Sequence, residues 1–284
     1  GDDISRLECQ LSYPLLVKPQ TQILLWPHIK GFVVPTREAL RPTYERLVRS
    51  ATYSPLLVGC DRDVVRPVLQ EFFPHAAQRI YNLSGFVDET GELFVVRASR
   101  KVLQRPRRIG VGLCFEEAET DLPLAGRLLA LCRRVGYYGA FEAEFIQQGP
   151  RFLLIDFNPR FYGQMGFDIA RGLPLPLFVY EAALGRRERL RAMVEGARRS
   201  PAGPGAFCNR IDLGLLVGLQ RLAGNMDTTD EARWRSWVAS HDGALTDAIV
   251  DPSDRGPQLA YVAEEFGRFL RHPRSFLREL GSAV

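Results

Sequence analysis

The sequence GAFEAEFIQQGPRFLLIDFNPRF, residues 139–161, alternates apolar and polar side chains on both sides of a short Gln148-Gly149-Pro150 turn. A period of two is typical of β-strands, in which successive side chains point to opposite faces. Gly and Pro between two such runs favour a tight connection. The segment therefore predicts a β-hairpin.

The predicted hairpin gathers polar groups on one face. Glu142 and Glu144 alternate with apolar residues in the first strand, and Asp156 and Asn158 do so in the second. The apolar faces of the two strands must match, so we expect the four polar side chains to converge. On the opposite face we expect Phe141, Ala143, Phe145, Leu153, Ile155 and Phe157.

Three clustered carboxylates repel one another unless a cation or hydrogen-bond donors compensate their charge. Carboxylate and amide oxygens suit a hard cation, and Mg²⁺ often takes one or two carboxylates and completes its shell with phosphate oxygens and water. Arg160, just beyond the hairpin, offers a second positive group. The alternative is a solvated strand face whose carboxylates pair with nearby arginines.

The length and composition of the chain are typical of a folded, soluble protein. The 284 residues can form two units with cores of their own, and 46% hydrophobic with 25% charged residues is ordinary for a folded, soluble chain. No apolar run reaches the roughly 18 residues needed to cross a bilayer, and the first residues do not form a signal sequence. We expect a cytoplasmic protein without membrane contacts.

The net charge of +4 and the spacing of the cysteines argue against a nucleic-acid-binding protein and against a protein held together by disulfides or zinc. No run of basic residues is interleaved with aromatics, so nucleic-acid binding is not expected. The five cysteines form no CxxC pair, which favours buried, reduced thiols over disulfides or zinc ligands. They are Cys9, Cys60, Cys114, Cys132 and Cys208.

Lysine is rare in this chain. Of 37 basic residues only Lys18, Lys30 and Lys101 are lysine. Lys18 and Lys101 lie at or near the ends of predicted strands, where a long charged side chain can reach into a cleft. Both are candidates for binding phosphate, with a solvated surface charge as the alternative.

Local patterns along the rest of the chain predict a mixed α/β fold with antiparallel strands. Strands are expected at residues 13–18, 31–34, 55–59 and 67–73, and a hairpin over 79–102. Helices are expected over 36–50, capped by Thr36, and over 116–135, ending at Gly136. From about Leu173 the chain is expected to be mostly helical, with a linker at residues 196–207.

The common phosphate-binding loops GxxxxGK[ST] and GxGxxG are absent. The order YPLLVKP, VLQEFF, ASRK, FEAEF and LLIDFNPRFYG instead resembles the ATP-grasp family, and most of all its carboxylate-amine ligases. The resemblance covers about residues 12–185. It implies two ATP-grasp lobes and a helical end: a partial N-terminal lobe with a hinge (1–73), a C-terminal lobe with the metal and phosphate site (74–195), and a linker with a helical segment (196–284).

The same resemblance implies roles for individual residues. Lys18 and Lys101 would contact the phosphates of ATP, and Arg160 would meet the transferred phosphate, so Arg160 and Lys101 are the expected catalytic residues. Adenine would bind at the hinge and ribose near Gln78. The full expected set is Lys18, Glu71, Phe72, Phe73, Gln78 and Lys101 for the nucleotide, and Glu144, Asp156 and Asn158 for Mg²⁺ or Mn²⁺. Asp156 stands where the family usually has glutamate.

The implied reaction joins a small-molecule carboxylate, such as an amino acid or peptide, to an amine through an acyl phosphate. Family members also have an N-terminal α/β domain and an earlier phosphate-binding lysine, which residues 1–11 cannot hold. We therefore expect a longer chain or a partner such as a second copy to complete the cleft. The alternatives are a non-catalytic nucleotide-binding or interaction module, and another ATP-dependent phosphoryl transferase.

Overall fold

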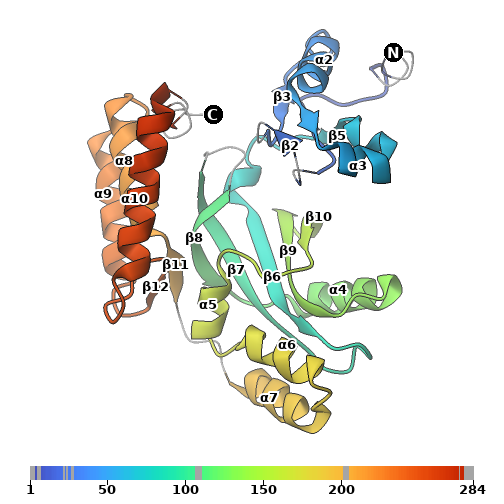
Figure 1. Ribbon diagram of the computed structural model, residues 1–284, viewed down its shortest axis with the longest axis vertical. Helices are drawn as coiled ribbons and strands as arrows, with labels where there is room; N and C mark the ends of the chain where they lie inside the picture. Colours follow the sequence, from blue (N-terminus) through green and yellow to red (C-terminus); the bar gives the residue numbers. More distant parts are fainter. Residues whose placement is uncertain are drawn as a thin grey trace. The chain divides into compact units, whose positions relative to one another are not determined.

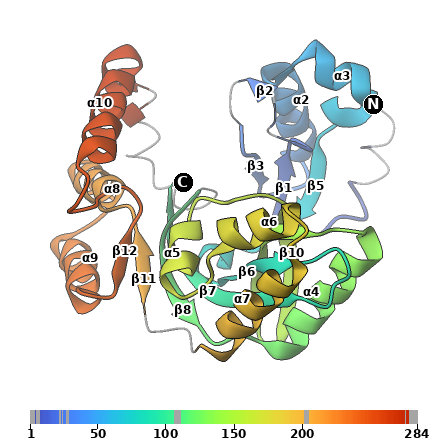
Figure 2. The same ribbon diagram turned by 60° about the horizontal axis from the view of Figure 1, so that its bottom comes forward.

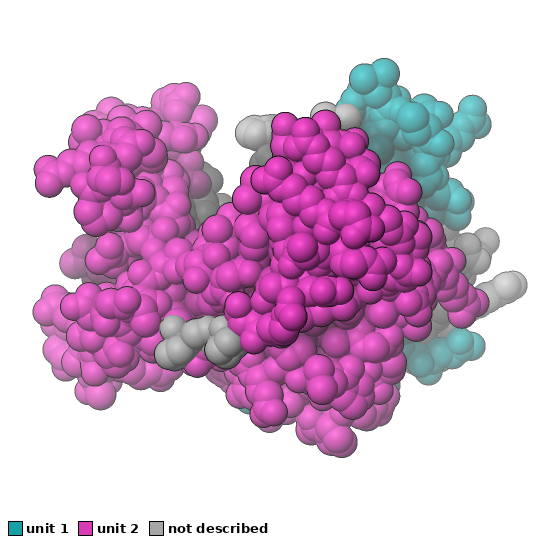
Figure 3. Space-filling model, turned by 90° about the horizontal axis from the view of Figure 1, so that it is seen from below, with its two compact units in different colours: residues 1–76 teal, residues 77–284 magenta. Residues whose placement is uncertain are grey.

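The computed structural model describes residues 4, 8–21, 23, 25–26, 29–105, 111–200, 205–274 and 276–277 (Figure 1). The chain forms two compact units, Gly1–Ala76 and Ala77–Val284, which are coloured separately in Figure 3. Each combines helices with a mainly antiparallel sheet, which confirms the predicted mixed α/β class.

The first unit is built on a three-stranded sheet in the order β3-β1-β5. Its strands are β1 (Leu15–Lys18), β3 (Phe32–Val34) and β5 (Val68–Glu71), all antiparallel. Helix α2 (Leu40–Ser50) packs on this sheet through Leu40 and Leu47. Strands β2 (Leu25–Trp26) and β4 (Thr52–Tyr53) pair separately.

Two predictions in the first unit were wrong in detail. Residues 55–59 form helix α3 (Pro55–Cys60) instead of a strand, because Ser54 accepts a hydrogen bond from the Leu56 amide and Pro55 occupies the first turn. Helix α2 begins at Leu40 without a side-chain cap, so Thr36 does not cap it. Pro42 falls in the first turn, where its missing amide proton costs no helical hydrogen bond.

The second unit is built on a seven-stranded sheet in the order β10-β9-β6-β7-β8-β11-β12, antiparallel except for β11 and β12. The hairpins predicted over 79–102 and 139–161 are β6–β7 and β9–β10. The strands are β6 (Ile80–Val87), β7 (Phe94–Arg105), β8 (Val111–Ala118), β9 (Gly139–Gln148), β10 (Arg151–Asn158), β11 (Ala206–Cys208) and β12 (Leu245–Asp247).

Helices cover both faces of this sheet (Figure 2). On one face, α4 (Leu122–Val135) packs through Leu128 against Phe141 and its neighbours. On the other, Phe86 and Val95 pack against a helical layer at one end of the sheet. That layer contains α5 (Met165–Ala170), α6 (Leu175–Ala183) and α7 (Arg187–Arg199). The side chains in the middle of this second face are mostly polar.

The helix predicted over 116–135 is shorter than expected. Residues up to Ala118 belong to β8, and α4 begins only at Leu122, where Asp121 accepts a hydrogen bond from the Leu124 amide. Of the acidic run that favoured a helix start, Glu116 and Glu117 therefore lie in a strand, and Asp121 caps the helix. Gly136 ends the helix in a left-handed conformation, as predicted.

The C-terminal part is helical, as predicted, but two of its segments join the sheet. β11 pairs with β8 and with β12, so residues 77–284 form one unit. Within the described part, a further core contains Cys114, Leu216 and Trp234. The helices of this part are α8 (Arg210–Leu222), α9 (Thr228–Ser240) and α10 (Gly256–Arg271).

All five cysteines are free. Cys114, Cys132 and Cys208 are buried, whereas the expectation of burial was wrong for Cys9 and Cys60. Cys60 lies in α3, a short helix without a buried residue. Among the described helices, none has the length and apolar composition to span a membrane.

Candidate functional site

The register of the sheet brings the predicted polar residues together. Glu144 lies opposite Asp156 and Glu142 lies opposite Asn158 across β9 and β10. Directly opposed residues of an antiparallel pair share one face, so the expected convergence of these four side chains is confirmed. Strand β6 extends the polar face, because Asn82 lies opposite Glu144.

A β-bulge in β10 corrects one part of the predicted faces. The register shifts between Leu154 and Asp156, and Ile155 is the extra residue. Because the shift inverts the alternation, Leu153 lies opposite Ile146, on the same face as Asp156 and not on the opposite one. The bulge lets Phe152 and Phe157 both pack towards the α4 side while Asp156 still faces Glu144.

Lys101 supplies the positive charge that the clustered carboxylates require. Its Nζ lies 2.7 Å from Oε1 of Glu144, and only 4% of the Lys101 side chain is exposed. A lysine is rarely buried this deeply without a charged partner. Lys101 thus lies beside a predicted metal ligand, and its role at the phosphates stays a prediction.

Glu142 is a buried carboxyl with two donors. It accepts hydrogen bonds from Gln164 and from Nδ2 of Asn158, the latter at 3.1 Å. Burial, and then the charge of Glu144, raise the pKa of Glu142 from 4.5 to about 7. Glu142 is therefore close to half-protonated at neutral pH and supports the neighbouring ligands.

This raised pKa predicts how stability varies with pH in a metal-free protein. Protonated Glu142 gives stability that is complete below pH 4.5 and is lost as pH rises through about 7. Glu142→Gln removes the titration, so in EDTA we expect it to unfold like the unaltered chain at pH 5 but to be more stable at pH 8.5, by up to roughly 3 kcal/mol. Urea unfolding at both pH values checks this, and an equal difference at both would contradict it.

Arg160 follows β10 and lies at the predicted metal ligands. Its guanidinium donates to Oδ1 of Asn158 at 2.9 Å and to the carbonyl of Phe161 at 2.9 Å. Asn158 in turn donates to Asp156 at 3.4 Å. The exposed guanidinium is thus held beside the site but remains accessible to an anion.

The sequence did not indicate that a buried hydrogen-bond network holds the residues after β10. Asp168 accepts hydrogen bonds from Ser84 (2.7 Å), Tyr162 (2.7 Å) and Arg171 (2.6 Å). Its side chain is 1% exposed, and Arg171 also donates to the Ala98 carbonyl. The network ties Tyr162 to the sheet and thereby positions the residues after β10. An Asp and an Arg three residues apart in an apolar helix were the available signal.

The donor set fits a hard cation. Glu144, Asp156 and Asn158 offer two carboxylates and an amide, which is the number of protein carboxylates that Mg²⁺ commonly uses. In the described ranges, no three or more His, Cys, Asp or Glu side chains are placed to hold a metal. Any cation here would thus need oxygens from a ligand or water, and the metal roles stay predictions.

The other predicted nucleotide residues lie in different places. Lys18 ends β1 opposite Val68, and Glu71 ends β5 in the first unit, followed by Phe72 and Phe73. In the second unit, Gln78 lines a cavity of about 430 Å³ together with Arg79, Ile80, Arg100, Gln147 and Gly149. The nucleotide roles of these residues stay predictions.

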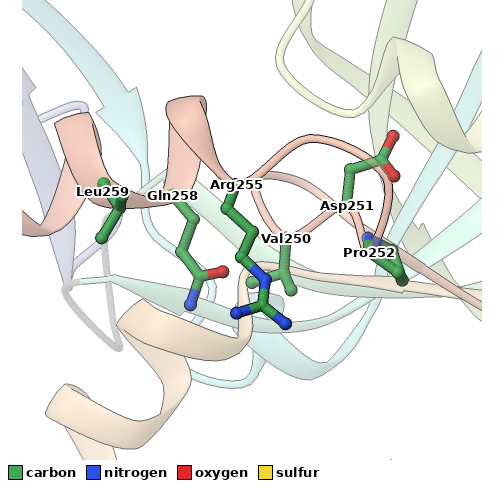
Figure 4. A pocket seen from close by; sticks show the side chains of 6 residues that line it. All are labelled: Val250, Asp251, Pro252, Arg255, Gln258 and Leu259. Atoms are coloured by element: carbon green, nitrogen blue, oxygen red, sulfur yellow. The ribbon is translucent and has the colours of Figure 1, made fainter.

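A separate cavity of about 390 Å³ lies at the start of α10 (Figure 4). The Asp251 side chain in its wall is already bonded to Ser253. No predicted site residue lines this cavity, and we assign it no function. Its walls come from Val250, Asp251, Pro252, Arg255, Gln258 and Leu259.

No protein-family model matches this sequence, and no curated protein sequence does. Among solved structures, the chain is similar to the biotin carboxylase domain of Hydrogenobacter thermophilus 2-oxoglutarate carboxylase, solved as a dimer with MgADP, ADP and bicarbonate. That match has 13% identity and a TM-score of 0.46, and covers 70% of this chain and 40% of that one.

Two further matches are of the same kind. The biotin carboxylase subunit of pyruvate carboxylase gives 16% identity and a TM-score of 0.37, covering 65% of this chain and 39% of that one. The biotin carboxylase domain of a thermophilic 2-oxoglutarate carboxylase bound to bicarbonate gives 13% identity and a TM-score of 0.42, covering 70% of this chain and 39% of that one. The chain thus spans about 40% of these proteins. Similarity at this level carries no argument about function.

Proposed function

We propose that this chain is an ATP-dependent carboxylate-amine ligase of the ATP-grasp type. The observation that carries the proposal is the polar face of the sheet, where Glu144 lies opposite Asp156 and is paired with the buried Lys101. Phosphoryl transfer needs cations around the phosphates and little covalent work by the protein. The ordered sequence motifs that resemble the ATP-grasp family end in this same hairpin.

In the proposed reaction, an oxygen of the substrate carboxylate attacks the γ-phosphorus of ATP and ADP leaves, giving an acyl phosphate. An amine then attacks the acyl carbon, phosphate leaves, and the amine loses a proton as the amide forms. Glu144, Asp156 and Asn158 would hold Mg²⁺, which, when bound, neutralises charge on the phosphates. Lys101 and Arg160 would stabilise the negative oxygens of the transferred phosphoryl group.

The experiment that tests this proposal is ADP release in the presence of Mg-ATP and a matrix of carboxylic acids, amino acids and amines. A ligase is expected to release ADP only with a matched pair of substrates, and hydroxylamine should trap its acyl phosphate as a hydroxamate. A stable phosphorylated product without an amide would favour another phosphoryl transferase. Binding of Mg-ATP without ADP release from any pair would favour a non-catalytic nucleotide-binding module.

A further inference from the structure

Asn82 lies in the middle of the polar face, between the two strands that carry the site. It is opposite Ser99 of β7 on one side and Glu144 of β9 on the other. None of its surface is exposed. Because directly opposed residues of an antiparallel pair share one face, Asn82 is the neighbour of Glu144 on β6.

Neither Nδ2 nor Oδ1 of Asn82 has a hydrogen-bond partner. Buried polar groups in proteins are nearly always bonded, and an unpaired amide destabilises the fold that contains it. A leucine has nearly the same shape and would fill this position without that cost. The amide at Asn82 therefore does not serve the stability of the ligand-free protein.

In the ligand-free protein, the carboxylate of Glu144 is paired with Lys101 and not with Asn82. Glu144 directs its Oε1 to Nζ of Lys101 at 2.7 Å. If phosphates draw Lys101 away, the Glu144 carboxylate that would hold Mg²⁺ loses the donor that fixes its orientation, and a neighbouring donor can replace it. Asn82, directly opposite on β6, has an unused donor beside it.

We propose that Asn82 is a positioning residue, whose amide donates to the Glu144 carboxylate when Lys101 leaves it for the phosphates of a metal-bound nucleotide. This inference rests on the proposed function. Donors around a metal ligand fix its orientation, and their loss typically weakens metal binding about 10- to 100-fold. Asn82 thus acts through Glu144 and does not itself touch the nucleotide.

Isothermal titration calorimetry with ADP, in Mg²⁺ and in EDTA, tests the proposal on the full chain. For Asn82→Leu we expect the Kd for ADP in Mg²⁺ to rise at least about tenfold. The Kd in EDTA should be unchanged, and the melting temperature of the ligand-free chain should be unchanged or raised. Asn82→Ala, which cannot overfill the position, is expected to weaken Mg²⁺-dependent binding in the same way.

Asn209→Leu is the matched control, because the Asn209 side chain caps α8 by accepting a hydrogen bond from the Asp212 amide. It should lower the melting temperature and leave both Kd values unchanged. Unchanged Mg²⁺-dependent binding of ADP in both Asn82 variants would overturn this inference alone. An equal loss of ADP affinity in Mg²⁺ and in EDTA, together with a lowered melting temperature, would also overturn it. Failure of the unaltered chain to bind MgADP would overturn the proposed function and this inference with it.

Discussion

Asp156→Ala is expected to abolish ATP turnover, with a loss of at least about a hundredfold, while the fold stays intact. Asp156 is exposed at the edge strand β10, and among the described residues its side chain accepts one hydrogen bond, from Asn158 at 3.4 Å. Its removal therefore costs little stability but takes away one of two carboxylates that face the proposed metal. Steady-state ADP release, together with a thermal melt, checks both parts of the expectation.

Glu144→Ala is expected to abolish turnover as well, but with a stability cost that Asp156→Ala lacks. It leaves Lys101 buried without its carboxylate partner. Glu89→Ala, in the exposed turn between β6 and β7, is the control and should change neither property. Undiminished turnover in Asp156→Ala and Glu144→Ala would contradict the metal assignment.

Asp168→Ala is expected to cause the largest loss of stability in the second unit, roughly 3 to 5 kcal/mol. The change removes the acceptor of Ser84, Tyr162 and Arg171 at once. The Arg171 guanidinium stays buried without a carboxylate and keeps the Ala98 carbonyl and the Phe167 ring as partners. Chemical unfolding followed by circular dichroism measures the loss.

Two companion variants separate this mechanism from a general effect of losing a charge. Tyr162→Phe removes one neutral donor from Asp168, so we expect a loss of about 1 kcal/mol. Asp242→Ala lies at an exposed position and is expected to change stability by less than about 0.5 kcal/mol. A loss for Asp168→Ala no larger than that for Tyr162→Phe would contradict the described network.

Sequence periodicity predicted the central hairpin well because alternation and the need to bury one face determine its register. Glu144 and Asp156 share one face of the hairpin, as expected. The bulge at Ile155 could not be predicted, because the residues of the two strands are the same whether or not one of them is left without an opposite partner. The error at residues 55–59 has a local cause: Ser54 followed by Pro55 is a helix-start signal, and the apolar run after it also suits a strand.

Long-range contacts set the limit for predicting the site. Lys101 and Glu144 are 43 residues apart, and Ser84 and Asp168 are 84 apart. Each residue alone is compatible with a solvated surface position, and the order of strands in the sheet brings Lys101 and Glu144 together. The sequence did predict that the acidic face needs a positive group, but not that Lys101 would be bonded directly to Glu144.

A crystal structure of the chain grown with ADP and Mn²⁺ tests the central claim most directly, because anomalous scattering locates the metal independently of the protein. We predict a manganese peak bound by Glu144 and Asp156 beside Asn158, with Lys101 moved from Glu144 to a phosphate oxygen. A nucleotide and metal bound elsewhere, with the Lys101–Glu144 ion pair intact, would contradict the account.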